Sequence, residues 1–287
     1  MHADSGSTIL AFAGSAIRIA TPLGIAALGE TITERSGVIN IGIEGAMLCG
    51  ALGSALGAHA TGSVAVGFLA GAVAGLLASA LFGWFTVLLR TDQIVVGTAI
   101  TLGATGLTGA LYRAAFGTTG TALNLPSIGS VIPAGFLFVS APLLWFTLTR
   151  TQWGLALRAA GESPGAALAA GIPVRGVRMA ATLFGGVMAG GAGATLVLAQ
   201  AGTFAEGITA GRGFIAIAIV VLGRWNPLGV LAAALLFGAA SALQFAFQAA
   251  GIAVPYQFFL MLPYAVSLLA LAGVFGRAQA PEALGQP

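Results

Sequence analysis

The stretch GAMLCGALGSALGAHATGSVAVGFLAGAVAGLLASALFGWFTVLL, residues 45–89, contains no Asp, Glu, Lys or Arg. A membrane-spanning helix needs about 20 consecutive apolar residues, so this stretch is long enough for two such helices joined by a tight turn. Its apolar residues run continuously instead of alternating with polar ones, which favours helices over a membrane β-barrel. The stretch therefore predicts a bundle of helices whose solvent is lipid.

The composition of the whole chain agrees with this prediction. Charged residues make up 7% of the 287 residues and hydrophobic residues 58%, whereas a typical soluble domain carries about 25% charged residues. A second run without charges lies between Arg224 and Arg277. The 44 glycines are typical of membrane helices that pack closely. We expect an all-α polytopic membrane protein with residues 1–287 forming a single transmembrane domain in a lipid bilayer.

The apolar segments predict about nine transmembrane helices plus short or broken helices. Residues 214–223 are too short to cross a bilayer at about 1.5 Å per residue, so they form either a half-helix or a tilted span that also uses residues 209–213. Arg18 is either a charge in a solute pathway or a side chain that reaches the membrane interface. The predicted segments are residues 9–28, 38–58, 63–89, 94–112, 131–149, 177–199, 214–223, 228–248 and 254–273.

The arginines predict the orientation, because cytoplasmic loops of membrane proteins are enriched in Lys and Arg. Alternating the loops places Arg113 and Arg212 on one side of the membrane and most other arginines on the opposite, cytoplasmic side. The N-terminus is then outside and the C-terminus cytoplasmic. The arginines assigned to the cytoplasmic side are Arg35, Arg90, Arg150, Arg158, Arg175, Arg178, Arg224 and Arg277.

The longest predicted cytoplasmic connection covers residues 150–176 and contains signals for short helices. Ser163 followed by Pro164 is a helix start, a helix over 166–170 follows, and Gly171 ends it. Two interpretations stay open for this segment. It is either a docking element for another protein or an ordinary connecting loop.

Polar residues gather at two places among the apolar segments. In residues 30–51, Glu30, Glu34 and Glu44 lie among apolar neighbours; they either contact a polar substrate or cap helices and bond between them. In residues 200–213, we expect Glu206 to pair with Arg212, in either a surface loop or a substrate contact. The candidate substrate-pathway residues are Asn40, Gly42, Glu44, Gly45, Gln200 and Glu206.

No residue pattern indicates catalysis. His2 and His59 lie far apart, Cys49 is the single cysteine, and no nucleophile–base pair or metal-ligand spacing is present. All eleven basic residues are arginine, so the chain lacks the lysine that a P-loop needs for nucleotide phosphates. The basic residues are scattered, which gives no support to binding of a nucleic acid polymer. We predict no catalytic residue, no metal and no cofactor in this chain, which is therefore not an enzyme.

Four segments nevertheless resemble a known family. They are RIATPLGIAALGETITERSGVINIGIEGAMLCGA at 18–51, TDQIVVGTAITLGATGLTGALY at 91–112, GESPGAALAAGIPV at 161–174 and GRGFIAIAIVVLGRWNP at 211–227. They look like the permease subunits of bacterial ABC importers for nucleosides and simple sugars, which belong with ribose and branched-chain amino acid permeases. Ribose-type relatives carry a Gly-Gly-Ile-Asp-Leu-Ser-type motif where this chain has residues 36–42, which favours the nucleoside branch. Those relatives also have an additional N-terminal helix, and its absence here agrees with the N-terminus predicted outside.

This resemblance implies a set of partners and a docking segment. A separate ATP-binding cassette ATPase would hold ATP and Mg²⁺, a second permease subunit (a similar paralogue or a second copy) would complete the pathway, and an extracytoplasmic binding protein would deliver substrate. The protein would be located in the bacterial cytoplasmic (inner) membrane. The residues implied to couple to the ATPase are Gly161, Glu162, Pro164, Ala166, Ala167 and Gly171.

A different transport mechanism is the competing hypothesis. An ion-coupled secondary transporter or channel for a small polar solute would need intramembrane charges as ion sites, and Glu30, Glu34 and Glu44 are the acidic cluster available for that role. Uptake by this protein alone, driven by an ion gradient, would favour that hypothesis over the importer.

Overall fold

The computed structural model describes residues 5–117, 125–249, 261, 265 and 279–286. The predicted span 254–273 therefore lies outside the described residues. In the described part the secondary structure is helical. The helices are α1 (Ser5–Arg35), α2 (Ile43–Thr61), α3 (Val64–Gly83), η1 (Trp84–Leu88), α4 (Gln93–Phe116), α5 (Val131–Arg150), α6 (Gln152–Glu162), α7 (Pro164–Ala169), α8 (Val174–Thr195), η2 (Leu196–Ala201), α9 (Arg212–Leu222) and α10 (Pro227–Ala249).

Six described helical segments are long and apolar enough to cross a membrane. The prediction of about nine crossings is not confirmed by this count. The helix α2 has 19 residues and is not among the six, and α9 has only 11 residues. The six segments are Ile9–Arg35, Val64–Leu88, Gln93–Phe116, Val131–Arg150, Val174–Ala201 and Pro227–Gln244.

The helix α9 decides between the two interpretations of residues 214–223. It begins at Arg212, and Thr209 to Gly211 form turns instead of extending it. At about 1.5 Å per residue, its 11 residues are too short to cross a bilayer. Among the described residues, α9 is thus a half-helix and not a tilted full span.

The centre of the bundle is α8, which packs against α1, α2 and α3. Glycines let these backbones approach closely: a Cβ on Gly193 would collide with the carbonyl oxygen of Met47, and one on Gly50 would collide with Gly190. Helices in lipid associate largely through such close packing of small residues. The predicted role of the abundant glycine is confirmed at these contacts.

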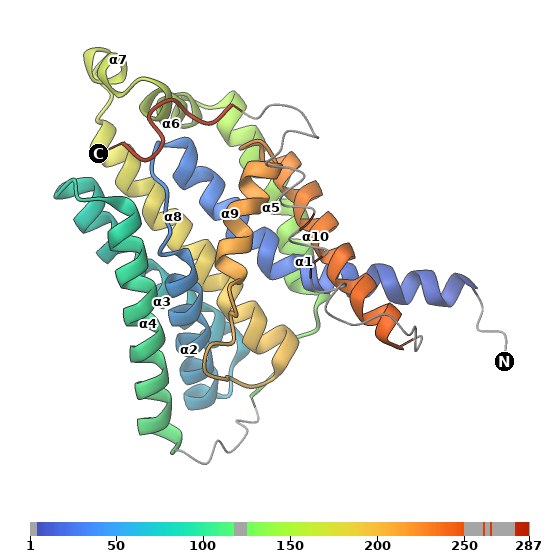
Figure 1. The fold of residues 1–287 in the computed structure, drawn as a ribbon. Helices are drawn as coiled ribbons and strands as arrows, with labels where there is room; N and C mark the ends of the chain where they lie inside the picture. The colour runs from blue at the N-terminus through green and yellow to red at the C-terminus, as the bar shows by residue number, and fades with distance from the viewer. Residues whose placement is uncertain (1–4, 118–124, 250–260, 262–264, 266–278, 287) are drawn as a thin grey trace.

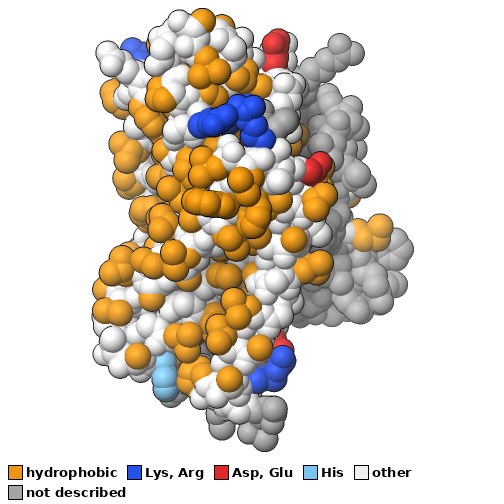
Figure 2. All heavy atoms as spheres, turned by 90° about the vertical axis from the view of Figure 1, so that its left-hand side faces the viewer, with side chains coloured by type: hydrophobic (Ala, Val, Ile, Leu, Met, Phe, Trp, Pro, Cys, Tyr) orange, Lys and Arg blue, Asp and Glu red, His pale blue; other side chains and the backbone are white. Residues whose placement is uncertain are grey.

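The two ends of the bundle differ. The short helices α6 and α7 lie at one end together with the C-terminal residues, and the end of α4 lies at the other (Figure 1). On the face shown in Figure 2, hydrophobic side chains cover much of the surface and basic side chains gather near its upper part. Large exposed apolar residues such as Leu69, Leu77, Leu102 and Val139 fit a surface in contact with lipid.

Candidate functional site

A non-helical segment, residues 36–42, separates α1 from α2 inside the bundle. Its backbone is held by side chains of neighbouring helices. The backbone N–H of Asn40 donates to Oε1 of Glu30 at 2.8 Å, and that of Ile39 donates to Oε1 of Gln93 at 2.7 Å. A buried segment without helical bonds needs such partners for its backbone groups. Glu30, on α1, and Gln93, on α4, thus fix the shape of this break.

Glu44, in the first turn of α2, binds the beginning of α9. Its Oε1 accepts hydrogen bonds from the hydroxyl of Thr209 at 2.6 Å and the backbone N–H of Gly211 at 2.8 Å, and its Oε2 accepts one from the N–H of Gly213 at 2.6 Å. The first N–H groups of a helix lack partners within the helix and favour an acidic group. Glu44 is therefore a cap that joins two broken helices, and it is 7% exposed.

Asn40, Gly42 and Gly45 lie where α2 begins against α4. A Cβ on Gly45 would be 3.0 Å from Cα of Thr101, and one on Gly42 would be 3.5 Å from Cα of Gly97. Gly45 therefore allows a close approach of α2 to α4, whereas a Cβ on Gly42 would make an ordinary van der Waals contact with α4. Asn40 is 1% exposed, and both of its side-chain polar atoms lack a hydrogen-bond partner in the described structure. These three predicted residues and Glu44 form one cluster.

Gln200 and Glu206 lie apart from this cluster. Nε2 of Gln200 donates to the carbonyl oxygen of Arg18 on α1 at 2.6 Å. Glu206 forms an ion pair with Arg113 of α4 at 2.7 Å, and both side chains are about half exposed, 46% and 48%. The predicted partner of Glu206 was wrong, because Arg212 instead donates to the carbonyl oxygens of Ile208 and Thr209.

Arg18 is exposed and donates to the hydroxyl of Ser15 at 3.5 Å. It precedes Arg35, at the end of α1, by about 25 Å of helix at 1.5 Å per residue. That separation approaches the thickness of the hydrocarbon core, about 30 Å. The position favours the interpretation of Arg18 as an interfacial side chain.

The predicted docking segment forms two short helices, α6 and α7. Pro164 is the first residue of α7, Ser163 precedes it, and Gly171 follows with φ +81°, the left-handed region that favours glycine. Ala167 is 3% exposed and packs with Ala160 and Val174, whereas Ala166 is exposed. The two alanines therefore differ: Ala166 is accessible to another protein, while Ala167 holds α7 onto the bundle.

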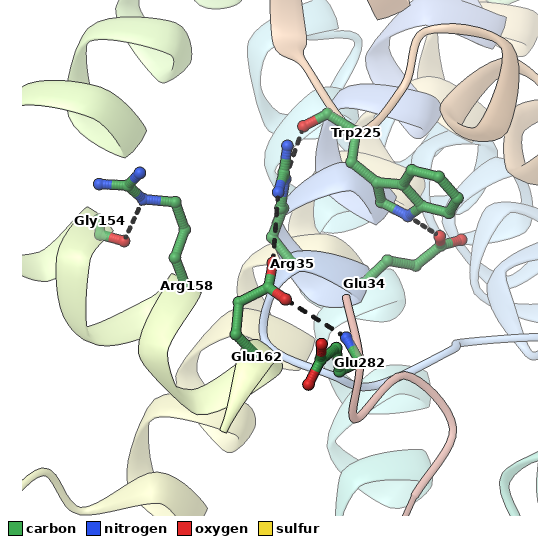
Figure 3. A network of polar contacts seen from close by, with 7 residues as sticks. All are labelled: Glu34, Arg35, Gly154, Arg158, Glu162, Trp225 and Glu282. Atoms are coloured by element: carbon green, nitrogen blue, oxygen red, sulfur yellow. Dashed lines mark hydrogen bonds and ion pairs between the residues drawn. The ribbon is translucent and has the colours of Figure 1, made fainter. Parts of the chain in front are cut away.

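A polar network connects α6 to the end of α1 (Figure 3). Nη1 of Arg35 lies 3.9 Å from Oε1 of Glu162, and Nε of Arg35 donates to the carbonyl oxygen of Trp225 at 2.8 Å. The indole N–H of Trp225 donates to Oε2 of Glu34. Glu34 is 2% exposed, so this donor pairs one oxygen of a carboxyl group that has left water. The turn before α10 thus holds the same end of α1 that contacts α6.

The C-terminal residues 279–286 lie against the same end of the molecule. Ala283 N–H donates to the carbonyl oxygen of Gly161 at 2.9 Å, and Gly285 N–H to that of Gly37 at 3.0 Å. Arg178 of α8 donates to the carbonyl oxygens of Ser36 and Gln286, at 3.2 and 2.9 Å. The sequence analysis did not identify these contacts. A buried carboxylate such as Glu34 signals that a donor exists, but the sequence alone does not say which one.

The described residues provide no cluster of metal ligands. They contain no group of three or more His, Cys, Asp and Glu side chains that could hold a metal ion. Cys49 is a free, half-buried thiol on α2. Apart from Asn40, the polar side chains described above bond to backbone and to one another, which is an arrangement for holding broken helices together.

Comparisons with known proteins agree with one another. The family model of the branched-chain amino acid transport system / permease component matches residues 12–271. The chain is 36% identical to the nucleoside ABC transporter permease protein NupC of Lactococcus lactis subsp. cremoris, with 92% of each chain covered. It is 35% identical to the guanosine ABC transporter permease protein NupQ of Bacillus subtilis, with 93% of each covered.

A third relative comes from an archaeon. The chain is 37% identical to the putative glucose ABC transporter permease protein TsgC13 of Haloferax volcanii, over 83% of this chain and 78% of the relative. No solved structure matches the chain.

Proposed function

We infer that this chain, which belongs to the branched-chain amino acid transport system / permease component family, forms the solute pathway of an ATP-driven importer whose preferred substrates are nucleosides. It is a permease subunit of an ABC importer for nucleosides or sugars and a multi-pass protein of the inner membrane. The observation that carries the inference is the near-complete coverage, 92% and 93%, by two nucleoside-type permeases.

The partners follow from the family. An ABC permease works with an ATPase and a substrate-binding protein. We propose that the ATPase is a separate chain that docks on α7, through the exposed residues around Ala166. The contact of α6 with Arg35 at the end of α1 supports this site, because α6 continues into α7. A second permease subunit, either a paralogue or a second copy, would complete the pathway.

The proposed orientation places α6, α7 and the C-terminal residues in the cytoplasm and the N-terminus outside. The arginines support it: Arg35, Arg158 and Arg178 gather around α6, α8 and the C-terminal residues, while Arg113 lies at the opposite end of α4. An excess of arginine marks the cytoplasmic side. The docking segment then faces the compartment that contains ATP.

The proposed substrate is a neutral polar molecule, a nucleoside first and a simple sugar second. Relatives named for nucleosides, guanosine and glucose support both classes. Asn40 offers buried donor and acceptor atoms without partners, which suits hydrogen bonding to hydroxyl groups. Glu44 is already occupied by three donors and is proposed as the cap that shapes the pathway, not as a substrate ligand.

The proposed mechanism couples ATP binding on the partner to the broken helices. Docking at α7 would favour an outward- or inward-open arrangement only through a difference in binding free energy between the two states. The break at residues 36–42 and the half-helix α9 are joined by Glu44, so they would move together. Catalysis of ATP hydrolysis would reside on the ATPase.

The test is uptake by the complete transporter. The chain is reconstituted with its ATPase, its partner permease and its binding protein, and uptake of labelled guanosine, adenosine, ribose and glucose is measured with and without ATP. We expect ATP-dependent uptake of the nucleosides. Retention of a sugar by the binding protein, with nucleosides ignored, would reverse the substrate order. Uptake by this chain alone, driven by an ion gradient, would instead establish the ion-coupled transporter.

A further inference from the structure

The helix α4 has two unlike faces. On one side, Val95, Ala99, Leu107 and Leu111 line an apolar cavity of about 790 Å³ that α4 forms with α2 and α3. The walls of this cavity are apolar residues apart from Cys49 and Thr108. This side of α4 therefore offers nothing to a polar solute.

The opposite face of α4 carries Thr98, Thr101 and Thr105 and ends at Arg113. These positions are three, four and eight residues apart, which places them along one side of a helix with 3.6 residues per turn. Thr98 and Thr105 are exposed and Thr101 is half-buried. The row from Thr98 to Arg113 is about 22 Å long at 1.5 Å per residue, which is most of the hydrocarbon core of about 30 Å. Leu102 lies on the same side and is 69% exposed.

The hydroxyls on this face keep their acceptor capacity. Thr98 donates to the carbonyl oxygen of Ile94 at 2.8 Å, Thr105 to that of Thr101 at 2.9 Å, and Thr101 to that of Ile41 at 3.4 Å. A hydroxyl has one donor and two acceptor lone pairs. Because each proton is used within the protein, the lone pairs remain available to an O–H or N–H group of a solute.

This face contacts the break at Thr101 and ends at the ion pair of Arg113. Thr101 contacts the start of α2 through Gly45 and bonds to Ile41 in the break. The ion pair between Arg113 and Glu206 lies at the C-terminal end of α4. Figure 1 shows α4 beside the beginning of α2. Between Asp92 and Arg113 the sequence has no charged residue, so a solute moving along this face meets hydroxyls and no unpaired charge.

We propose that the face of α4 formed by Thr98, Thr101 and Thr105 lines the solute pathway and accepts hydrogen bonds from the hydroxyl groups of a neutral polar solute. This inference rests on the proposed function and names the wall that the solute contacts. Its competitor is a face that contacts lipid, since a threonine that bonds to its own helix is tolerated in a bilayer. The two differ in whether water reaches the face.

Cysteine accessibility separates them. The chain has a single cysteine, so Cys49→Ala gives a background in which this chain carries no thiol. In that background Thr98→Cys, Leu102→Cys and Thr105→Cys are reconstituted with the complete transporter and treated with a membrane-impermeant thiosulfonate reagent. Leu107→Cys, on the cavity side of the same helix, is the matched control. We expect the first three to react, Leu107→Cys to stay inert, and guanosine to slow the reaction at Thr105→Cys.

Equal inertness of all four positions would overturn the inference and assign the face to lipid. Reaction at Leu107→Cys as fast as at Thr105→Cys would overturn it as well. Neither result bears on the proposed function, which is decided by ATP-dependent uptake of the wild-type protein. Absence of that uptake would contradict the proposed function, while the labelling pattern would still decide whether water reaches this face.

A second measurement asks whether the hydroxyls contact the solute. Thr98→Val and Thr105→Val keep the shape of the side chain and remove the hydroxyl. Loss of one accepted hydrogen bond corresponds to about a two- to tenfold change, so we expect KM for uptake to rise by that factor. Thr149→Val, at an exposed threonine of α5 that bonds to its own helix, should leave KM unchanged. Unchanged KM in both test variants would show that the hydroxyls make no solute contact.

Discussion

Replacing Glu44 by alanine should destabilise the protein more than replacing Glu206, the other carboxylate among the predicted solute-pathway residues. The carboxylate accepts hydrogen bonds from Thr209, Gly211 and Gly213 and thereby holds the beginning of α9 against α2. Without it, the first N–H groups of α9 lose their acceptor, because a helix provides none for them. The half-helix would then be attached to α2 by packing alone.

The expected magnitude follows from the burial of the three donors. Leaving one buried donor without a partner costs about 1–3 kcal/mol. Thr209 and Gly213 are buried and Gly211 is half-buried, so counting two donors gives about 2–6 kcal/mol. Loss of an acidic group at a helix N-terminus adds about 0.3–1 kcal/mol. Glu44→Gln keeps one acceptor oxygen and should fall between the wild type and Glu44→Ala.

The assay is thermal unfolding of the purified protein in detergent at one fixed scan rate. At roughly 2–4 °C per kcal/mol, Glu44→Ala should lower the apparent Tm by at least about 4 °C. The control is Glu206→Ala, which removes an exposed carboxylate whose ion pair with Arg113 is worth about 0–1 kcal/mol. The reasoning is refuted if Glu44→Ala and Glu206→Ala melt at the same temperature, because α9 would then not depend on this cap.

Three further changes test other contacts. Gly193→Ala should lower Tm because its Cβ would collide with a backbone oxygen of α2, whereas Gly191→Ala on the same helix meets no atom within 4 Å and should not; equal melting curves would contradict the packing described for α8. Ala166→Trp should abolish co-purification with the ATPase at unchanged Tm, while Ala167→Trp should lower Tm itself, since Ala167 is 3% exposed; an intact complex with the first variant would argue against docking on α7. Trp225→Phe removes the indole N–H that donates to Glu34 on α1 and should lower the free energy of unfolding by about 1–3 kcal/mol. The loss should be smaller in a Glu34→Gln background. An equal loss in the two backgrounds, measured by thermal unfolding, would show that the indole acts through other contacts.

Six of the predicted spans have counterparts among the described helices that are long and apolar enough to cross a membrane, and their boundaries differ from the prediction where polar residues are buried. The first span was predicted over residues 9–28, yet α1 runs from Ser5 to Arg35. A sequence window treats Glu30 and Glu34 as the end of an apolar helix. In the structure the helix continues, and the N–H of Asn40 and the indole of Trp225 each donate to one oxygen of these two carboxyl groups. Those donors lie outside the helix, and no local pattern identifies them.

The second span was predicted too long, whereas the first was predicted too short. It was predicted from residue 38, but α2 begins at Ile43. Residues 38–42 are apolar enough to read as helix, and Gln93 on α4 and Glu30 on α1 instead hold them in a non-helical segment. In contrast, the start of α7 was predictable, because Pro164 is its first residue, although the side chain of Ser163 makes no capping hydrogen bond. Local signals were readable from sequence, and tertiary contacts were not.

The candidate residues show the same difference between local signals and tertiary contacts. Asn40, Gly42, Glu44 and Gly45 lie together because they are near one another in the chain, and their role in a solute pathway stays a prediction. The pairing of Glu206 was predicted wrongly because its partner, Arg113, lies on α4, far away in sequence. Capping was one of two interpretations of Glu44, but the capped helix proved to be α9 and not its own helix. A helix N-terminus offers its donors to any nearby acid, whatever its distance along the chain.

In the proposed mechanism, motion of α7 reaches the break through contacts at the end of α6, and the stiffness of each contact decides which one can transmit it. The ion pair between Glu162 and Arg35 is 3.9 Å long, with side chains 49% and 23% exposed, and such a pair is worth at most about 1 kcal/mol. Moving a two-state equilibrium from 1:99 to 99:1 takes about 5.5 kcal/mol, so the ion pair is too weak to act alone. Gly161, at the end of α6, packs so closely on α1 that a Cβ there would collide with the carbonyl oxygen of Arg35. Because packed backbones resist displacement far more than a solvated ion pair does, we propose the close contact at Gly161 as the route by which α6 and α7 would displace α1 and the break that follows it.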